Sequence, residues 1–134
     1  MTVALNDTIR RLLDTPVFIT VATIQPDGSP QLSPVWVKRD GDAVLFSTTT
    51  DRRKTLNIGR DPRVSLLLMP FDEPYTYAEI RGTATLTEAG GQDLIDELSL
   101  KYTGKRYADH NPRAKDEAAR VVVRVTPRRV VGRL

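Results

Sequence analysis

The chain has 134 residues, of which 40% are apolar and 28% are charged, a balance typical of globular proteins that excludes a disordered or membrane-embedded class. It contains no cysteine, so disulfides, thiolate nucleophiles and cysteine-ligated metal centres are excluded, and redox chemistry would need a bound cofactor. Fifteen of its twenty basic residues are arginines and the net charge is +3, which favours anionic ligands because the guanidinium fork recognises phosphate and carboxylate groups.

The first thirteen residues predict a short amphipathic helix. Leu5, Ile9 and Leu12 recur at helical spacing, with Asn6 or Asp7 available as its cap. The segment lacks the basic and apolar regions of a signal peptide, and no stretch of the chain approaches the ~18 apolar residues that span a bilayer. A cytoplasmic location without a membrane partner is therefore expected.

Six short strands are predicted after this helix, joined mostly by turn signals. Their β-branched runs are interrupted by Gln25–Pro30 and Arg39–Asp42, which are rich in Pro, Asp and Gly. Apolar and polar residues alternate along Tyr75–Thr87, and Gly82 predicts a bend within it. The predicted strands are residues 17–24, 31–38, 43–48, 63–69, 75–87 and 121–131, the last of them bent at Pro127.

Two further helices interrupt these strands. A short helical segment is predicted around Thr55–Ile58, and an apolar stripe along Glu88–Tyr102 predicts the longest helix. Lys105–Lys115 has no period and is predicted to be a loop, in which Pro112 begins a turn of helix. The pattern predicts a mainly β fold with flanking helices, an antiparallel sheet that forms a closed or partly closed barrel, in one domain over residues 1–134.

Signatures of the common enzyme classes are absent. There is no phosphate-binding loop ending in Gly-Lys-Ser/Thr, no dinucleotide Gly-x-Gly-x-x-Gly, no nucleophile elbow and no His-Glu-x-x-His. His110 is the only histidine, which argues against a histidine-ligated metal and against a Ser-His-Asp triad. Because the next residues, Asn111 and Pro112, are turn formers, His110 is predicted to be a loop residue. No metal site is expected, and no catalytic residue is assigned.

The most informative segment runs from Ser47 to Asn57. Hydroxyl side chains end a strand, and Arg52, Arg53 and Lys54 then occupy the first turn of a helix, where the macrodipole already places positive charge. Free backbone N–H groups, hydroxyls and guanidinium forks gathered at one point suit a phosphate. The alternative is that these side chains extend into water. Cations in the first turn of a helix are locally unfavourable, and nothing visible in the sequence compensates them, which favours the anion site.

Three other groups of residues have both a structural and a ligand-binding interpretation. Trp36, the only tryptophan, is either a core ring or a ligand contact. Tyr75 and Tyr77, two apart on one strand face, either line a pocket for a planar ligand or fill a barrel interior. A second basic cluster, which is either functional or the solvated charge of an edge strand, comprises Arg128, Arg129 and Arg133.

Four motifs follow one another along the chain. They are Thr-x-x-x-Asp-Gly-x-Pro at residues 23–30, Ser-Pro-Val-Trp at 33–36, Ser-Thr-Thr-x-x-Arg-x-Lys-x-x-Asn at 47–57 and Asp-Pro-Arg-Val at 61–64. In this order they resemble the pyridoxamine-phosphate-oxidase-like split-barrel flavoproteins over nearly the whole chain, and most of all the small actinobacterial-type branch that uses the deazaflavin coenzyme F420. The resemblance implies an antiparallel six-stranded split β-barrel that forms a homodimer, with two cofactor sites at the interface.

The resemblance also assigns residues to the cofactor site. Residues of segment 47–57 would hold the phosphate, strand 34–36 would lie along the tricyclic ring, and a tyrosine or an arginine would reach the cofactor from the other subunit. The phosphodiester and polyglutamate tail of F420 would also account for the number of arginines. The cofactor-binding residues that it implies are Pro34, Val35, Trp36, Ser47, Thr48, Thr49, Arg52, Lys54, Asn57, Tyr77 and Arg129.

The implied function is an F420-dependent reductase that transfers a hydride from the reduced cofactor to a small-molecule electron acceptor such as a conjugated carbonyl, a quinone or a lactone. Two alternatives stay open: FMN in place of F420, giving a flavin reductase or oxidase, and a cofactor-binding protein without turnover. Vitamin B6 oxidation is disfavoured, because the longer phosphate-binding insertions and C-terminal substrate motif of true pyridoxamine-phosphate oxidases are missing. Nucleic-acid binding is disfavoured, because the chain has only eight aromatic residues, few of them interleaved with arginine.

Overall fold

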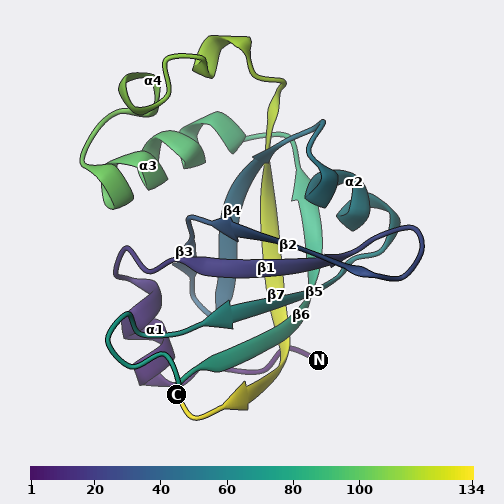
Figure 1. Ribbon diagram of the computed structural model, residues 1–134, viewed down its shortest axis with the longest axis vertical. Helices are drawn as coiled ribbons and strands as arrows, with labels where there is room; N and C mark the ends of the chain where they lie inside the picture. The colour runs from purple at the N-terminus through teal and green to yellow at the C-terminus, as the bar shows by residue number, and fades with distance from the viewer.

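The computed structural model describes the whole chain, residues 1–134. An antiparallel sheet forms its centre, with α3 and α4 at one end and α1 at the other (Figure 1). In chain order the elements are α1 (Asp7–Leu13), β1 (Ile19–Ile24), β2 (Pro30–Val35), β3 (Lys38–Asp40), β4 (Ala43–Thr49), α2 (Arg53–Arg60), β5 (Arg63–Leu68), β6 (Ala78–Thr87), α3 (Gly91–Thr103), α4 (Tyr107–His110), the 3-10 turn η1 (Ala114–Asp116) and β7 (Arg120–Gly132).

The sheet is an open barrel, and its strand order explains why. The seven strands are arranged β2-β1-β5-β6-β7-β4-β3, so that the two edge strands, β2 and β3, are consecutive in the chain. Only Trp36 and Val37 separate them, and the three peptide links between Val35 and Lys38 span at most about 11 Å. The two edges are therefore drawn together and the sheet curls, but β2 and β3 do not pair. The barrel is split at Trp36.

The mainly β fold with flanking helices is confirmed, but the sheet has seven strands instead of the six predicted. The predicted strand 31–38 is divided at Val37, whose N–H donates to the Tyr102 hydroxyl over 3.1 Å and whose carbonyl accepts from Nζ of Lys101 over 2.6 Å. Side chains of α3 thus satisfy the main-chain groups that a continuous ladder would use. The chain then changes direction, and most of the predicted turn 39–42 becomes the end of β3 and its hairpin with β4.

The longest strand pair, β6 with β7, confirms the predicted bend at Gly82. The register shifts between Arg81 and Gly82, and Gly82 lies opposite Pro127. A Cβ at Gly82 would lie 2.4 Å from the carbonyl oxygen of Thr126, so the close approach of the two strands requires glycine there. Proline has no N–H to donate to a ladder, and it is tolerated here because the ladder is interrupted at the irregularity. Both strands continue through the bend.

The helices begin and end close to the predicted residues. Oδ1 of Asn6 accepts from the N–H of Ile9 over 2.8 Å and caps α1, as expected of an N-cap asparagine. Gly104 follows α3 with a φ of 73°, the left-handed conformation that ends many helices. The predicted loop 105–115 needs correction, because it contains the helical turn α4 before Pro112 in addition to η1 after it. His110 is the last residue of α4 and not a loop residue.

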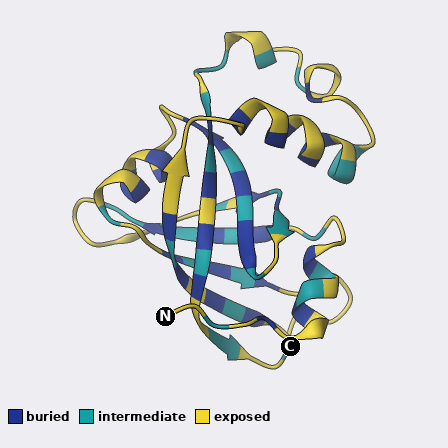
Figure 2. Ribbon diagram, turned by 180° about the vertical axis from the view of Figure 1, so that it is seen from behind, coloured by how far each residue is buried: buried dark blue, intermediate teal, exposed yellow.

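One hydrophobic core fills the barrel and extends beneath α1. It is a cluster of eighteen buried residues that includes Ile9 and Leu13 of α1 and Phe46 of β4. The alternation of buried and more exposed residues along the strands, and the buried inner side of α3, are visible in Figure 2. This core fixes the strand ends around the split. The structure contains no helix with the length and apolar character that crossing a membrane requires.

Candidate functional site

A cavity of about 440 Å³ lies at the split of the barrel, where β2 ends. Its volume falls within the range of small-molecule and cofactor sites, about 300–1,000 Å³. Segments far apart in the sequence form its walls: the end of β2, the start of α2, the end of β4, α3, α4 and the start of β7. The residues assigned to the cofactor that line it are Pro34, Val35, Trp36, Ser47, Arg52 and Lys54.

Aromatic rings form one wall of the cavity. The Trp36 ring stacks on Tyr102 with 5.5 Å between the ring centroids and 15° between the planes, and the His110 ring lies 5.2 Å from Trp36 at 55°. The Tyr102 hydroxyl donates to the carbonyl of Val17 and accepts from the N–H of Val37. These bonds hold Tyr102 behind Trp36. The tryptophan is therefore a partly exposed ring in the cavity wall, which offers a planar ligand an apolar surface.

Lys54 is the feature that defines the electrostatics of the cavity. It is only 7% exposed and lines the cavity, yet no ion pair or side-chain hydrogen bond in the structure involves its ammonium group. Desolvation lowers the pKa of Lys54 from its ordinary value, and the nearby charges of Arg52 and Arg120 lower it further. A buried cation surrounded by two more cations is an unfavourable arrangement that an anionic ligand would relieve.

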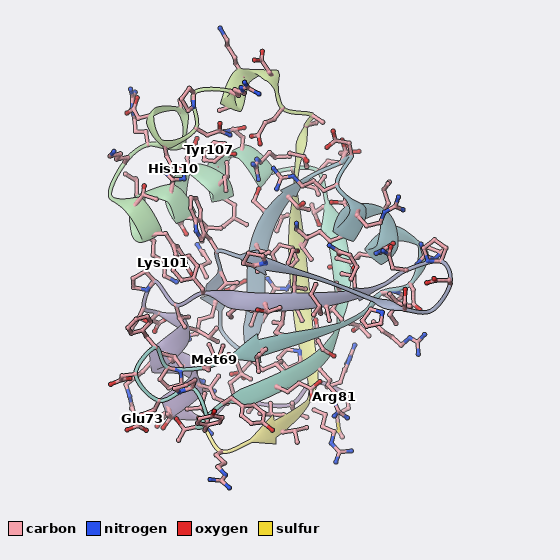
Figure 3. All side chains as sticks on the ribbon, in the orientation of Figure 1. Met69, Glu73, Arg81, Lys101, Tyr107 and His110 are labelled. Atoms are coloured by element: carbon pink, nitrogen blue, oxygen red, sulfur yellow. The ribbon has the colours of Figure 1, made fainter.

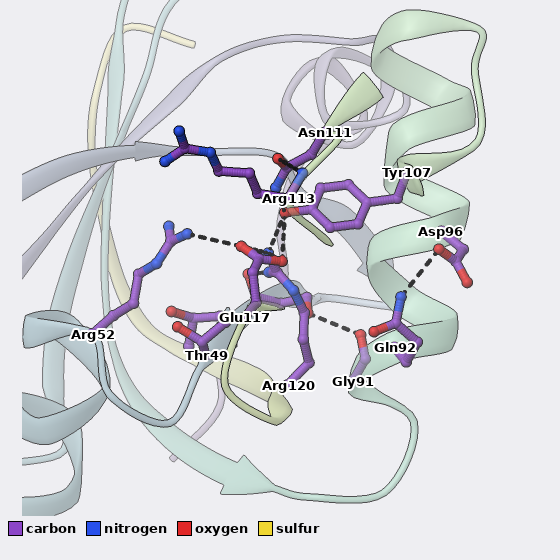
Figure 4. A network of polar contacts seen from close by, with 12 residues as sticks. Thr49, Arg52, Gly91, Gln92, Asp96, Tyr107, Asn111, Arg113, Glu117 and Arg120 are labelled. Carbon is purple, nitrogen blue, oxygen red and sulfur yellow. Dashed lines mark hydrogen bonds and ion pairs between the residues drawn. The ribbon is translucent and has the colours of Figure 1, made fainter. Parts of the chain in front are cut away.

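Arg120 anchors a polar network beside Lys54, drawn in Figure 4. Its Nη2 lies 2.6 Å from the Tyr107 hydroxyl and 3.0 Å from Oε1 of Glu117, and its Nη1 donates to the carbonyl of Ser47 over 3.3 Å. The side chain is 5% exposed, and its buried Nε has no hydrogen-bond partner. Charged groups are rarely buried without full satisfaction. The unpartnered Nε is therefore a buried donor without compensation, on a side chain that lines the cavity.

Three of the assigned residues, Thr48 and Thr49 at the end of β4 and Asn57 on α2, lie where α2 packs on the sheet and do not line the cavity. Oγ1 of Thr55 donates to the main-chain carbonyl of Thr49 over 2.6 Å, and its hydroxyl also contacts that of Thr48. Nδ2 of Asn57 donates to Oγ1 of Thr23 over 3.0 Å and to Gln25. These contacts fix the first turn of α2 against β1 and β4, and with it Arg52 and Lys54. Direct cofactor contact by Thr48, Thr49 and Asn57 stays a prediction.

Tyr77 and Arg129 lie at the other end of the sheet. Arg129 is nine residues beyond Arg120 on β7, which corresponds to about 30 Å along a strand. Tyr77 directly precedes Ala78, the first residue of β6, which pairs with Gly132 at the end of β7. Neither residue lines the cavity of its own chain. Their assignment to a cofactor from a second subunit stays a prediction.

Sequence reasoning missed the residues of α4 and β7 at the cavity. Tyr107 and His110 lie near one another on α4 (Figure 3), and both line the cavity together with Arg120. The spacing of Tyr107 and His110 places them on one face of a helical turn, but four residues are too few for a periodic signal. Arg120 precedes the valine run of β7 and looks like an ordinary polar strand end. No cluster of three or more His, Asp or Glu side chains is placed to hold a metal ion.

Known proteins of the same architecture resemble this chain over almost its full length. The sequence model of the family described as pyridoxamine 5'-phosphate oxidase matches residues 5–133. A solved structure named F420 reductase is 30% identical with a TM-score of 0.81, over 95% of this chain and 98% of that one. A conserved hypothetical protein from Mycobacterium tuberculosis is 28% identical with a TM-score of 0.75, over 96% and 84% of the two chains.

A more distant structure supports the fold alone. A putative pyridoxamine 5'-phosphate oxidase from Listeria innocua is 22% identical to this chain with a TM-score of 0.70, over 94% of this chain and 95% of that one. The fold is therefore shared by proteins that have diverged far in sequence, and the fold alone does not decide what a protein binds.

Proposed function

The chain belongs to the pyridoxamine 5'-phosphate oxidase family, a split-barrel family of flavin-binding oxidoreductases, and we propose that it is a reductase that uses coenzyme F420. It would transfer a hydride from the reduced cofactor to a conjugated carbonyl, quinone or lactone-type acceptor. The similarity to the protein named F420 reductase over 95% of the chain favours F420. Residues 1–134 would act as a single cofactor-binding domain.

The observation that carries the proposal is the unpaired ammonium group of Lys54 inside a cavity that also contains Arg52 and Arg120. The three cations are opposed by one carboxylate, Glu117, which pairs with both arginines. A phosphate or phosphodiester would supply the missing negative charge and accept hydrogen bonds from Lys54 and Arg52. The residues present therefore fit the phosphate group of F420 or of FMN.

The ring of the cofactor would lie along Pro34, Val35 and Trp36. β2 is an edge strand and its pairing with β1 ends at Val35. The chain leaves the ladder at Trp36, so main-chain groups of Trp36 would be available to the heteroatoms of a tricyclic ring. Tyr102 fixes Trp36 from behind. Tyr107 and His110 of α4, which also line the cavity, would lie beside the acceptor.

The reduced cofactor supplies a hydride, and the residues of the chain provide binding, orientation and exclusion of water. Lys54 and Arg52 would fix the anionic end, and the strand end at Trp36 would fix the ring at a constant distance from it. The apolar residues Phe18 and Ile95 at the wall would keep water from the reacting carbon. The tyrosine hydroxyl of Tyr107 already donates to Glu117 over 2.8 Å, so it would stabilise the site and not transfer a proton.

A homodimer is part of the proposal. Large apolar side chains are exposed on the single chain, with Phe71 and Tyr75 almost fully accessible, and such surfaces often mark contacts between subunits. Tyr77 and Arg129 can reach a cofactor only from a second copy. Sedimentation equilibrium at micromolar concentration is expected to give twice the mass of the chain. A monomer under these conditions would remove Tyr77 and Arg129 from the proposed site.

The choice between F420, FMN and neither is tested by titrating the protein with each oxidised cofactor. Trp36 is the only tryptophan and lies at the cavity wall, so a planar ligand stacked there should quench its fluorescence. We expect saturable quenching by F420 with a much weaker response to FMN. Arg52→Ala should weaken F420 binding about tenfold or more, which is typical of the loss of a charge-assisted hydrogen bond to phosphate.

Arg53→Ala is the matched control for this titration. Arg53 is the next residue along the chain, but it is exposed and does not line the cavity, so its loss should change the affinity less than twofold. FMN binding alone would replace F420 by a flavin. Binding of F420 without oxidation of its reduced form by any quinone or conjugated carbonyl would favour a cofactor-binding protein without turnover. No binding of either cofactor to the folded protein would contradict the proposal.

A further inference from the structure

Glu117 is the only carboxylate that pairs with the cations of the cavity. It does not line the cavity but lies behind its wall, where its side chain is 16% exposed. Oε1 accepts from the Tyr107 hydroxyl over 2.8 Å and from Arg120 over 3.0 Å, while Oε2 accepts from Arg120 over 3.1 Å and from Arg52 over 3.3 Å. The dashed contacts of Figure 4 converge on it.

The contacts of Glu117 fall into two classes. Its bonds to Arg120 and Tyr107 are partly buried and 2.8 to 3.1 Å long. A further bond from Asn111 to the Tyr107 hydroxyl, 3.0 Å long, supports them. Its contact with Arg52 is the longest of the set, and the Arg52 side chain is 48% exposed. Ion pairs of half-exposed side chains contribute little. Arg52 can therefore leave Glu117, whereas Arg120 and Tyr107 stay with it.

We propose that Glu117 is a specificity-determining residue that competes with the phosphate group of the ligand for Arg52 and thereby limits the affinity of the cavity for anions. The inference rests on the proposed function, because it concerns the same anion site. Without a ligand, Arg52 pairs with Glu117 behind the cavity wall, and Lys54 has no ionic partner. A phosphate must take Arg52 from the carboxylate and must also tolerate a negative charge behind the wall.

The competition has a consequence for ligand choice. A carboxylate close to the site penalises every added negative charge on the ligand, so weakly held inorganic anions cannot compete well, whereas a ligand that also gains stacking at Trp36 can. Glu117 at the same time positions Arg120 through two hydrogen bonds. Its charge therefore reduces anion affinity while its shape maintains the wall, and the two effects can be separated by an isosteric amide.

Glu117→Gln separates them. With the amide oxygen in place of Oε1, the bonds that this atom accepts from Tyr107 and Arg120 are kept. The amide nitrogen in place of Oε2 can accept neither the second bond from Arg120 nor the bond from Arg52, so Arg52 is freed for the ligand. Isothermal titration with inorganic phosphate, FMN and F420 is expected to show about tenfold tighter binding of each phosphate-bearing probe, the usual scale for relief of a nearby like charge. Riboflavin, which has the FMN ring without its phosphate, should bind the variant and the wild type equally.

Two further variants sharpen the test. Asp109→Asn removes a carboxylate on the same segment whose partner Arg106 is exposed, and it should leave all affinities unchanged. In an Arg52→Ala background, Glu117→Gln should produce a clearly smaller gain than in the wild type, because the group that is competed for is absent and only the relief of like-charge repulsion remains. If Glu117→Gln does not fold, Glu117→Asp keeps the charge near Arg120 but shortens the side chain away from Arg52, and an intermediate gain is expected.

The outcomes distinguish the inference from the proposed function. Unchanged or weaker phosphate binding by a folded Glu117→Gln protein, or the same gain for riboflavin as for FMN, would overturn the role of Glu117 while leaving cofactor binding intact. If neither cofactor binds the wild type but inorganic phosphate binds and tightens in the variant, the role of Glu117 stands and the proposed function fails. If no probe, phosphate included, binds either protein, both fail.

Discussion

Replacing Lys54 by methionine is expected to weaken binding of the phosphate-bearing cofactor by at least about 30-fold and, at the same time, to make the ligand-free protein more stable. The loss of affinity follows from the removal of a desolvated cation that would pair with the phosphate, an effect of about 2 kcal/mol or more. The gain in stability follows because Lys54 is buried without a counter-ion, and methionine fills a similar volume without a charge.

The stability difference should depend on pH in a defined direction. Desolvation and the charges of Arg52 and Arg120 lower the pKa of Lys54 in the folded protein below its ordinary value of 10.5. Between the lowered pKa and 10.5, the unfolded chain binds the additional proton, so the stability of the wild type rises with pH over that window. Below the lowered pKa the penalty is complete. The advantage of Lys54→Met should therefore be largest near neutral pH and shrink as pH approaches 10.5.

Urea denaturation of both proteins between pH 7 and 10.5, with and without cofactor, measures both effects. Lys115→Met is the control, because Lys115 is exposed and should change neither the affinity nor the free energy of unfolding. A Lys54→Met protein that is less stable than the wild type at pH 7 would show that the ammonium group has a favourable partner and would remove the main support for the anion site.

The architecture was readable from the sequence because its signals are local. Asn6 caps α1, Gly104 ends α3 and Gly82 bends β6, each through a backbone requirement that one residue type satisfies. The division between β2 and β3 was not readable, because it depends on Lys101 and Tyr102, more than sixty residues away. Main-chain groups bound by distant side chains leave no pattern in the strand itself.

The candidate site divides in the same way. Arg52 and Lys54 were found because cations at a helix start break a local preference, and Trp36 because it is a lone ring in a recognisable motif. Arg120, Tyr107 and Glu117 were missed because each is unremarkable at its own position and gains its meaning only where α4 and β7 meet. Gly91 shows how close that meeting is, since a Cβ there would lie 2.4 Å from the backbone of Arg120.

Arg120→Met is expected to destabilise the protein by about 3 kcal/mol, the scale on which removal of one partner of a buried ion pair leaves the other charge uncompensated. For a chain of this length the melting temperature should fall by about 10 °C. Arg120 contacts Glu117, the Tyr107 hydroxyl and the carbonyl of Ser47, and its guanidinium also lies 4.8 Å from the centroid of the Tyr107 ring. Its loss would affect β4, β7 and α4 together.

A charge on the same strand provides the control. Arg124 pairs with Asp40 over 2.7 Å, but both side chains are about half exposed, so Arg124→Met should change the free energy of unfolding by less than about 0.5 kcal/mol. The double variant Arg120→Met/Glu117→Leu removes both buried charges and should recover more than half of the loss, because the desolvated carboxylate causes most of it. If the single and double variants are equally destabilised, the lost free energy of unfolding comes from packing and from the contacts of Arg120 with Tyr107 and Ser47. The ion pair with Glu117 would then not be what holds α4 at the wall of the cavity.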